Sequence, residues 1–212
     1  AELEEIGGNA RFGKGAFAVV EADESDGSFL WFSPTVAVIT NMDEEHLDFF
    51  RNSSEILETY ASFAQRICPD GTLVGCVDDP NVRRLFAAVD RRKIGYGLSE
   101  AAALRQGSGQ ASITADRIQV GAGKSRFRSL REGKALGSVR LQIPGIHNVV
   151  NALAVIGVAL ALFGLHLYFT GQRAGLIALG TAGLLLLVGR FIGSRMSSPG
   201  RGAGVTLVIM ML

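Results

Sequence analysis

Acidic side chains gather in one short segment behind a predicted buried strand. Glu21, Asp23, Glu24 and Asp26 fall within six residues, directly after the apolar run Ala16–Val20. Four carboxylates at this spacing repel one another unless a cation offsets their charge. Ligands of open α/β sheets bind at the carboxyl ends of the strands. The segment predicts a site for a divalent metal or a substrate, whereas a solvated acidic loop is the plainer interpretation of the segment taken alone.

A second group of polar residues follows the next apolar run, Val36–Thr40. This run leads into Asn41 and, five residues later, His46. If the two predicted strands are parallel neighbours, Glu21 and His46 meet at the same edge of the sheet. A carboxylate and an imidazole there suit Mg²⁺ held with nucleotide phosphates, or a histidine that positions a substrate.

A third group, with His147, Asn148 and Asn151, opens a predicted helix behind Pro144-Gly145. Asn148 and Asn151 are three residues apart, so both amides face the same way and can contact a base or a phosphate. Capping of the helix by Asn148 would explain one asparagine but not both. Gly123-Lys124-Ser125 resembles the end of a phosphate loop, but Ile118 stands where that motif needs glycine, so we expect a β-turn.

The elements that position these groups alternate between strand and helix. Further apolar runs predict strands at 72–77 and 93–97, and helical spacing predicts helices that begin near Asn52 and at Asp79-Pro80. Short alternating segments between Ser112 and Ile143 predict antiparallel hairpins, and His147 to about Leu162 predicts a helix. The expected fold is an α/β domain with a mostly parallel sheet flanked by helices and a small antiparallel region.

Charge and apolar composition divide the chain. Its net charge is +1, but residues 1–132 hold all 20 acidic residues and 15 of the 21 Lys/Arg, a net charge of −5. Residues 174–189 contain no charge, and at about 1.5 Å per residue they span about 24 Å, less than the hydrocarbon core of a bilayer. We therefore expect a domain at 1–163 and an apolar helical tail at 164–212. The tail is a membrane hairpin within 152–193, a buried helical end, a gene fusion or the product of a frameshift.

Several segments together resemble one known family over residues 7–160. The segments are GGNARFGKG, VVEADESDGSFL, VAVITNMDEEHLDFF, VDDP and PGIHNVVNALA. They resemble the central ATP-binding domain of the Mur ligases, cytoplasmic enzymes that build the peptidoglycan precursor.

The resemblance implies an ATP-dependent ligation with Mg²⁺ as cofactor and UDP-N-acetylmuramate and L-alanine as partners, and it implies no nucleic acid. Glu21 and His46 resemble the family's catalytic and metal-binding pair. His147, Asn148 and Asn151 resemble its nucleotide-side residues, and Asp23, Glu24, Asp26 and Asn41 are expected on the substrate side.

The chain also departs from the family pattern. The phosphate loop that ends in Gly-Lys-Thr is expected about two dozen residues before Ala1, and the family pattern ends near Phe163. We therefore expect the chain as given to be inactive in ligation, with one edge of the sheet exposed. The alternative is a membrane-tethered module that binds a nucleotide or a metal and has no ligase activity.

Overall fold

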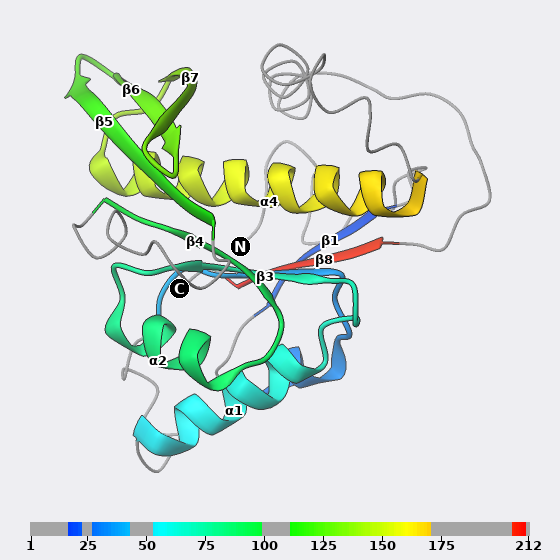
Figure 1. Ribbon diagram of the computed structural model, residues 1–212. Coiled ribbons are helices and arrows are strands. Elements are labelled where there is room, and N and C mark those ends of the chain that lie inside the picture. Colours follow the sequence, from blue (N-terminus) through cyan, green and yellow to red (C-terminus); the bar gives the residue numbers. More distant parts are fainter. Residues whose placement is uncertain (1–16, 23–26, 43–52, 99–110, 171–204, 211–212) are drawn as a thin grey trace, which may run out of the picture.

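The described residues of the computed structural model form one eight-stranded sheet with helices on both faces (Figure 1). The description covers all residues except 1–16, 23–26, 43–52, 99–110, 171–204 and 211–212. The strands are β1 (Phe17–Glu21), β2 (Val36–Ile39), β3 (Thr72–Cys76), β4 (Arg92–Tyr96), β5 (Ala111–Gly121), β6 (Lys124–Arg131), β7 (Lys134–Leu141) and β8 (Val205–Met210). The helices are the 3₁₀ helix η1 (Ser28–Trp31) and the α-helices α1 (Ser53–Gln65), α2 (Pro80–Ala88) and α4 (Ile146–Thr170).

The sheet is parallel from β1 to β5 and antiparallel beyond. Its order is β1-β8-β2-β3-β4-β5-β6-β7. β5 joins β4 through its first three residues, since Ile94, Gly95 and Tyr96 pair with Ala111, Ser112 and Ile113. The rest of β5 runs past the carboxyl end of β4 and pairs with β6, and β6 pairs with β7. The antiparallel hairpins therefore extend from the carboxyl edge of the parallel strands.

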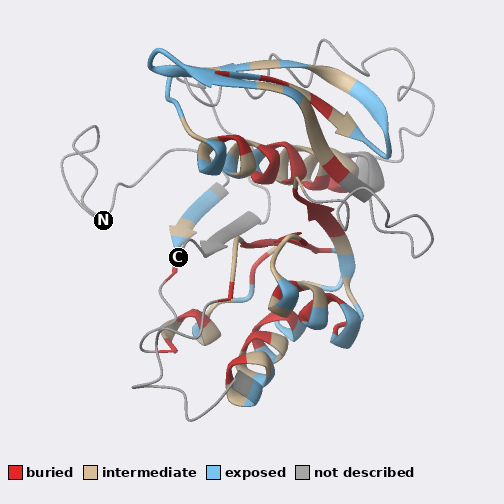
Figure 2. Ribbon diagram, turned by 90° about the vertical axis from the view of Figure 1, so that its left-hand side faces the viewer, coloured by how far each residue is buried: buried red, intermediate tan, exposed pale blue. Residues whose placement is uncertain are grey.

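Two apolar layers hold the sheet between its helices. Ala37, Ile39 and Leu73 face α1 and α2, while Val38 and Val74 belong to the layer beneath α4. All four residues of β2 and all five of β3 are buried, as strands covered on both faces require. Figure 2 shows buried residues along the part of α4 that packs on the sheet and exposed residues along the outside of the hairpins.

The start of α2 shows how the sequence sets an element. Asp79 caps the helix, because its Oδ1 accepts a hydrogen bond of 2.8 Å from the backbone N–H of Val82. Pro80 follows at the first helical position, where the missing N–H costs nothing. The Asp79-Pro80 pair therefore begins a helix, as its sequence predicts.

The observed fold confirms the expected α/β class, the parallel strands, the helices and the hairpins. The turn at Gly123 is also confirmed, because its φ of 73° lies in the left-handed region and Lys124 begins β6. The expected cap of α1, Asn52, lies outside the described residues.

Two expectations about the last third of the chain differ from the structure. The helix predicted to end near Leu162 continues to Thr170, and so α4 runs unbroken through residue 163. The expectation that β1 and β2 are neighbours is wrong, because β8 lies between them and pairs in parallel with both. The division of the chain into 1–163 and 164–212 stays a prediction.

Helix α4 is also long and apolar enough, over Ile146–Leu165, to cross a membrane. It contacts β2, β3, β4, β5 and β6, however. Packing against the sheet accounts for the apolar residues on the buried side of this segment. The second half of the predicted membrane hairpin lies outside the described residues.

Candidate active-site edge

The carboxyl ends of the parallel strands form the edge to which the sequence assigns chemistry. Glu21 is the last residue of β1 and is exposed, and Asn41 follows β2 by two residues and is half-buried. Both strands run in the same direction as β8, so Glu21 and Asn41 lie on the same edge. The strand between them separates the two residues more widely than the sequence predicts.

Asn41 sits in a segment that is tied to α2. Its Oδ1 accepts a hydrogen bond of 2.9 Å from the Thr40 hydroxyl. The amide of Asn81, in the first turn of α2, donates a 3.0 Å hydrogen bond to the carbonyl of Met42, which is itself buried. These contacts hold residues 40–42 against the helix, so that the backbone beyond β2 leaves the sheet in a set direction.

The start of α4 presents the third predicted group. The Asn148 amide donates a hydrogen bond of 2.6 Å to the carbonyl of Pro144, while His147 and Asn151 are exposed. Because α4 begins at Ile146, Asn148 lies inside the first turn and does not cap it. Gly145 has a φ of 120°, and a Cβ there would lie 2.5 Å from Cε1 of His147. Glycine therefore lets this histidine ring fold back over the turn.

The two aspartates of the VDDP segment serve the scaffold in this structure. Asp79 caps α2, and the Oδ2 of Asp78 accepts a 2.7 Å hydrogen bond from the backbone N–H of Leu98 beyond β4. The guanidinium of Arg83 donates to the carbonyls of Val77 and Asp78, at 2.6 and 3.0 Å. This network ties the loop after β3 to the loop after β4 at the site edge.

Tyr96, at the carboxyl end of β4, is a polar residue of this edge that the sequence does not reveal. It is fully buried, and its hydroxyl has no hydrogen-bond partner among the residues that the structure describes. Burial raises its pKa above the ordinary value, and the nearby Cys76 and Asp78 add to the rise. Burial also raises the pKa of the Cys76 thiol. An aromatic residue that ends an apolar strand has the pattern of an ordinary core residue, so no sequence signal separates it.

The remaining predicted residues lie outside the described part of the chain: Asp23, Glu24, Asp26 and His46. The described residues contain no group of three or more His, Cys, Asp or Glu side chains that could hold a metal ion. Glu21 is therefore the one predicted metal ligand with a described position, and its pairing with His46 stays a prediction. One carboxylate fits Mg²⁺, which keeps several water ligands in such sites.

Comparison with known proteins defines the class to which this fold and this edge belong. The Mur ligase middle domain family matches residues 8–159, which is more than half of the chain, and the chain belongs to this family.

Among curated proteins, the chain is similar to UDP-N-acetylmuramate–L-alanine ligases. That of Syntrophus aciditrophicus (strain SB) is 38% identical over 207 residues, which cover 98% of this chain and 38% of the relative. That of Nitratidesulfovibrio vulgaris (strain DP4) is 45% identical over 158 residues, which cover 74% of this chain and 33% of the relative. The chain thus spans between a third and two fifths of the length of these relatives. An alignment over 98% of the chain necessarily extends past residue 163.

Solved structures support the same fold. UDP-N-acetylmuramate–alanine ligase from Thermotoga maritima matches with a TM-score of 0.50 at 22% identity, over 76% of this chain and 32% of that chain. A ligase from Neisseria meningitides that joins UDP-N-acetylmuramate to a tripeptide matches with a TM-score of 0.51 at 21% identity, over 63% of this chain and 37% of that chain. Likeness at this level of identity shows the fold alone.

Proposed function

We propose that the chain is the central part of a cytoplasmic ligase that joins L-alanine to UDP-N-acetylmuramate at the expense of ATP, in peptidoglycan precursor synthesis. The proposal rests on one observation: the chain belongs to a family of ligases, and candidate site residues lie at the edge of the sheet where ligands bind. The chain belongs to the Mur ligase middle domain family, and the two L-alanine ligases described above are 38 and 45% identical to it. Glu21, Asn41 and the segments joined by Asp78 all lie at the carboxyl edge, where open sheets of this kind bind ligands.

The proposed reaction has two steps. The lactyl carboxylate of UDP-N-acetylmuramate attacks the γ-phosphorus of ATP, the bond to the β-phosphate oxygen breaks, and an acyl phosphate and ADP form. The amine of L-alanine then attacks the acyl carbon, inorganic phosphate leaves, and the amine loses a proton to give the amide. The enzyme's task is to position the reactants and to offset the charge of the phosphoryl group.

Each residue group has a role in this proposal. Asn148, Asn151 and His147, on the first two turns of α4, contact the nucleotide through amide and imidazole groups. Glu21 and His46 hold the metal and align the phosphoryl group. Mg²⁺ bound there supplies positive charge to the γ-phosphate oxygens.

The substrate side of the proposal consists of the acidic loop and the residue beyond β2. Asp23, Glu24, Asp26 and Asn41 contact UDP-N-acetylmuramate and L-alanine, whose amino group carries the positive charge that carboxylates attract. Asn41 supports this role through its position, because its hydrogen bond to Thr40 holds its side chain at the edge.

Nucleotide binding by the chain itself tests the proposal. We expect Mg·ATP to bind with micromolar to millimolar affinity in calorimetry, because the start of α4 is formed and exposes His147 and Asn151. Asn151→Ala should weaken binding about fivefold to tenfold, the equivalent of one hydrogen bond. Gln119→Ala removes an equally exposed carboxamide from the hairpins and serves as the control.

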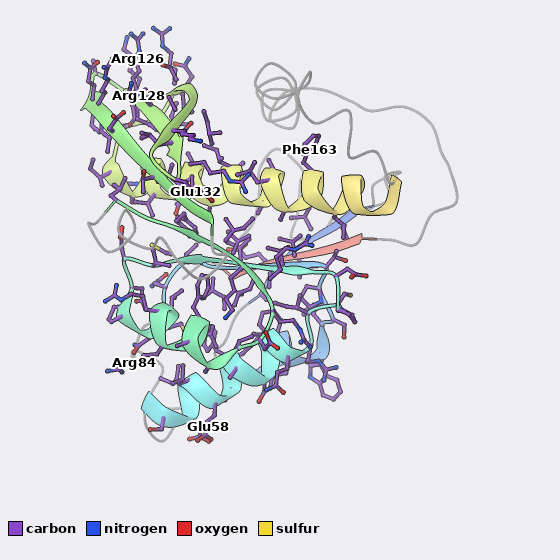
Figure 3. The ribbon with its side chains drawn as sticks, in the orientation of Figure 1. Glu58, Arg84, Arg126, Arg128, Glu132 and Phe163 are labelled. Atoms are coloured by element: carbon purple, nitrogen blue, oxygen red, sulfur yellow. The ribbon has the colours of Figure 1, made fainter. Side chains whose placement is uncertain are left out.

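The metal is tested in the same assay with Glu21→Gln. We expect this variant to lose the dependence of ATP affinity on Mg²⁺, whereas Glu58→Gln, on the outer side of α1 (Figure 3), should retain it. Wild-type chain that binds no ATP, or equal affinities for Asn151→Ala and wild type, would show that the α4 turn is not a nucleotide site.

A further inference from the structure

Exposed apolar side chains gather at one end of the hairpins. Val120, Ile143 and Ile146 are 45, 52 and 50% exposed, and they are half of the large apolar residues that are exposed in the described part of the chain. Val120 pairs with Ser125, Ser125 pairs with Leu141, and the Ser125 hydroxyl donates a 3.0 Å hydrogen bond to the carbonyl of Ile143. Strand register therefore brings residues 120–126 and 140–146 together at one end, which we call the hairpin tip.

Positive charge gathers at the same tip. Lys124, Arg126 and Arg140 are exposed, and Arg126 and Arg140 stand directly opposite each other on β6 and β7. Like charges in opposed positions destabilise a sheet. The neighbouring Arg128 is neutralised by an ion pair with Asp116, and residues 120–126 and 140–146 contain no acidic residue. Figure 3 shows Arg126 and Arg128 projecting from the hairpins, far from Glu58 and Arg84 on the other side of the molecule.

The backbone of the tip is bare. A Cβ at Gly121 or Gly123 would meet no atom within 4 Å, so the turn between β5 and β6 is open to a large flat partner. Phosphate groups fit the opposed guanidinium groups, and acyl chains fit the exposed valine and isoleucines. Single-stranded nucleic acid is disfavoured, because residues 120–126 and 140–146 contain no aromatic residue on which bases could stack.

We propose that the hairpin tip docks on the surface of a bilayer that contains anionic lipids. Strand register places Val120 on the face that carries Ser125 and Leu141, and it places Arg126 and Arg140 on the opposite face, so docking end-on brings both kinds of side chain to a bilayer. In peripheral membrane binding, apolar side chains enter the headgroup region and cations attract the anionic headgroups. Ile146 also begins α4, so docking places the first turn of that helix, with Asn148, beside the membrane surface. The proposal is independent of the ligase reaction and does not involve residues 171–204.

Sedimentation of the full chain with vesicles tests the proposal. Vesicles of phosphatidylcholine with phosphatidylglycerol should bind the chain, and vesicles of phosphatidylcholine alone should bind it at least tenfold more weakly. Arg126→Gln with Arg140→Gln should weaken binding about fivefold for each cation removed. Arg131→Gln with Lys134→Gln removes the same charge from the opposite end of β6 and β7 and serves as the matched control.

The apolar contribution is tested with Ile143→Ser, for which Val155→Ser, at an exposed position in the middle of α4, is the control. Circular dichroism of each variant verifies the fold. Equal loss of binding in the tip and control pairs would overturn the proposal in favour of net charge alone. Binding that resists high salt and is unchanged in every variant would overturn it in favour of insertion through another part of the chain. Capture of a poly-glutamate peptide without vesicle binding would identify an acidic protein as the partner instead.

Discussion

Gly157 sets how closely α4 approaches the sheet, and replacing it with alanine tests this packing. The residue is buried in the middle of the helix, and an added Cβ would lie 2.8 Å from Cγ1 of Val74 and 3.5 Å from side-chain carbons of Ile94 and Ile113. Carbon atoms pack at about 3.5–4.0 Å, so the helix or Val74 has to move by about 0.7 Å. Val74 is fully buried and β-branched, so its side chain has little freedom to turn away.

Two opposing effects determine the magnitude. Alanine is favoured over glycine in a helix interior by about 1 kcal/mol. Overpacking of a filled core costs about 1–3 kcal/mol. We therefore expect Gly157→Ala to lower the free energy of unfolding by about 1 kcal/mol, which corresponds to about 2–4 °C in Tm for a chain of this size.

Gly164 provides the matched control on the same helix. A Cβ there would meet only Nη1 of Arg92, at 3.9 Å, so Gly164→Ala keeps the helix-forming gain without the clash. We expect it to raise the free energy of unfolding by up to about 1 kcal/mol, and so the two variants should differ by about 2 kcal/mol. Urea unfolding followed by circular dichroism measures both. Equal stability of the two variants would refute the packing argument, as would a gain in stability for Gly157→Ala.

Three further substitutions test the scaffold of the site edge and of the hairpins. Gly145→Ala should destabilise the start of α4 by about 1–3 kcal/mol, because a φ of 120° is strained for alanine; hydrogen exchange in the first turns of α4 would reveal it, and unchanged protection would contradict it. Asp79→Ala should lower the free energy of unfolding by about 1 kcal/mol, because α2 loses its N-terminal cap. Thermal melts measure this loss, and Asp70→Ala, which removes a carboxylate that does not cap α2, serves as the control. The ion pair with Arg128 lowers the pKa of Asp116, so its stabilisation is present above the pKa of the unfolded state and is lost as pH falls through the lower pKa of the folded state. Arg128→Gln should reduce the change of the unfolding free energy with pH between those two pKa values. A pH dependence equal to that of the wild type would show that the ion pair does not contribute to stability.

Local patterns predicted the elements whose neighbours are close in sequence. The Asp79-Pro80 pair predicted the start of α2, and the Gly123 turn between alternating segments predicted the β5–β6 hairpin, because each signal acts within a few residues. The pattern near Leu162 misplaced the end of α4 by eight residues. The apolar composition continues to Thr170, and nothing at Leu162 is a helix-ending residue.

Long-range pairing accounts for what the sequence could not predict. β8 joins the sheet from more than 160 residues beyond β2. Its apolar residues do not indicate the strands with which it pairs. The role of Asp78 was equally hidden, because its partner, the backbone N–H of Leu98, is 20 residues away. The sequence alone does not distinguish a carboxylate that stabilises the fold from one that binds a ligand.

The position of β8 bears directly on the proposed metal site. β1 pairs with β8 and with no other strand of the described sheet, so the backbone ladder that holds Glu21 at the carboxyl edge passes through residues 205–210. Those residues fall in the segment that composition separates from the domain. A boundary at residue 163 would therefore place β1 and β8, which pair in the sheet, in different parts of the chain. In the described fold Glu21 and residues 205–210 therefore belong to one sheet, and the metal-binding role that we propose for Glu21 requires this strand pairing.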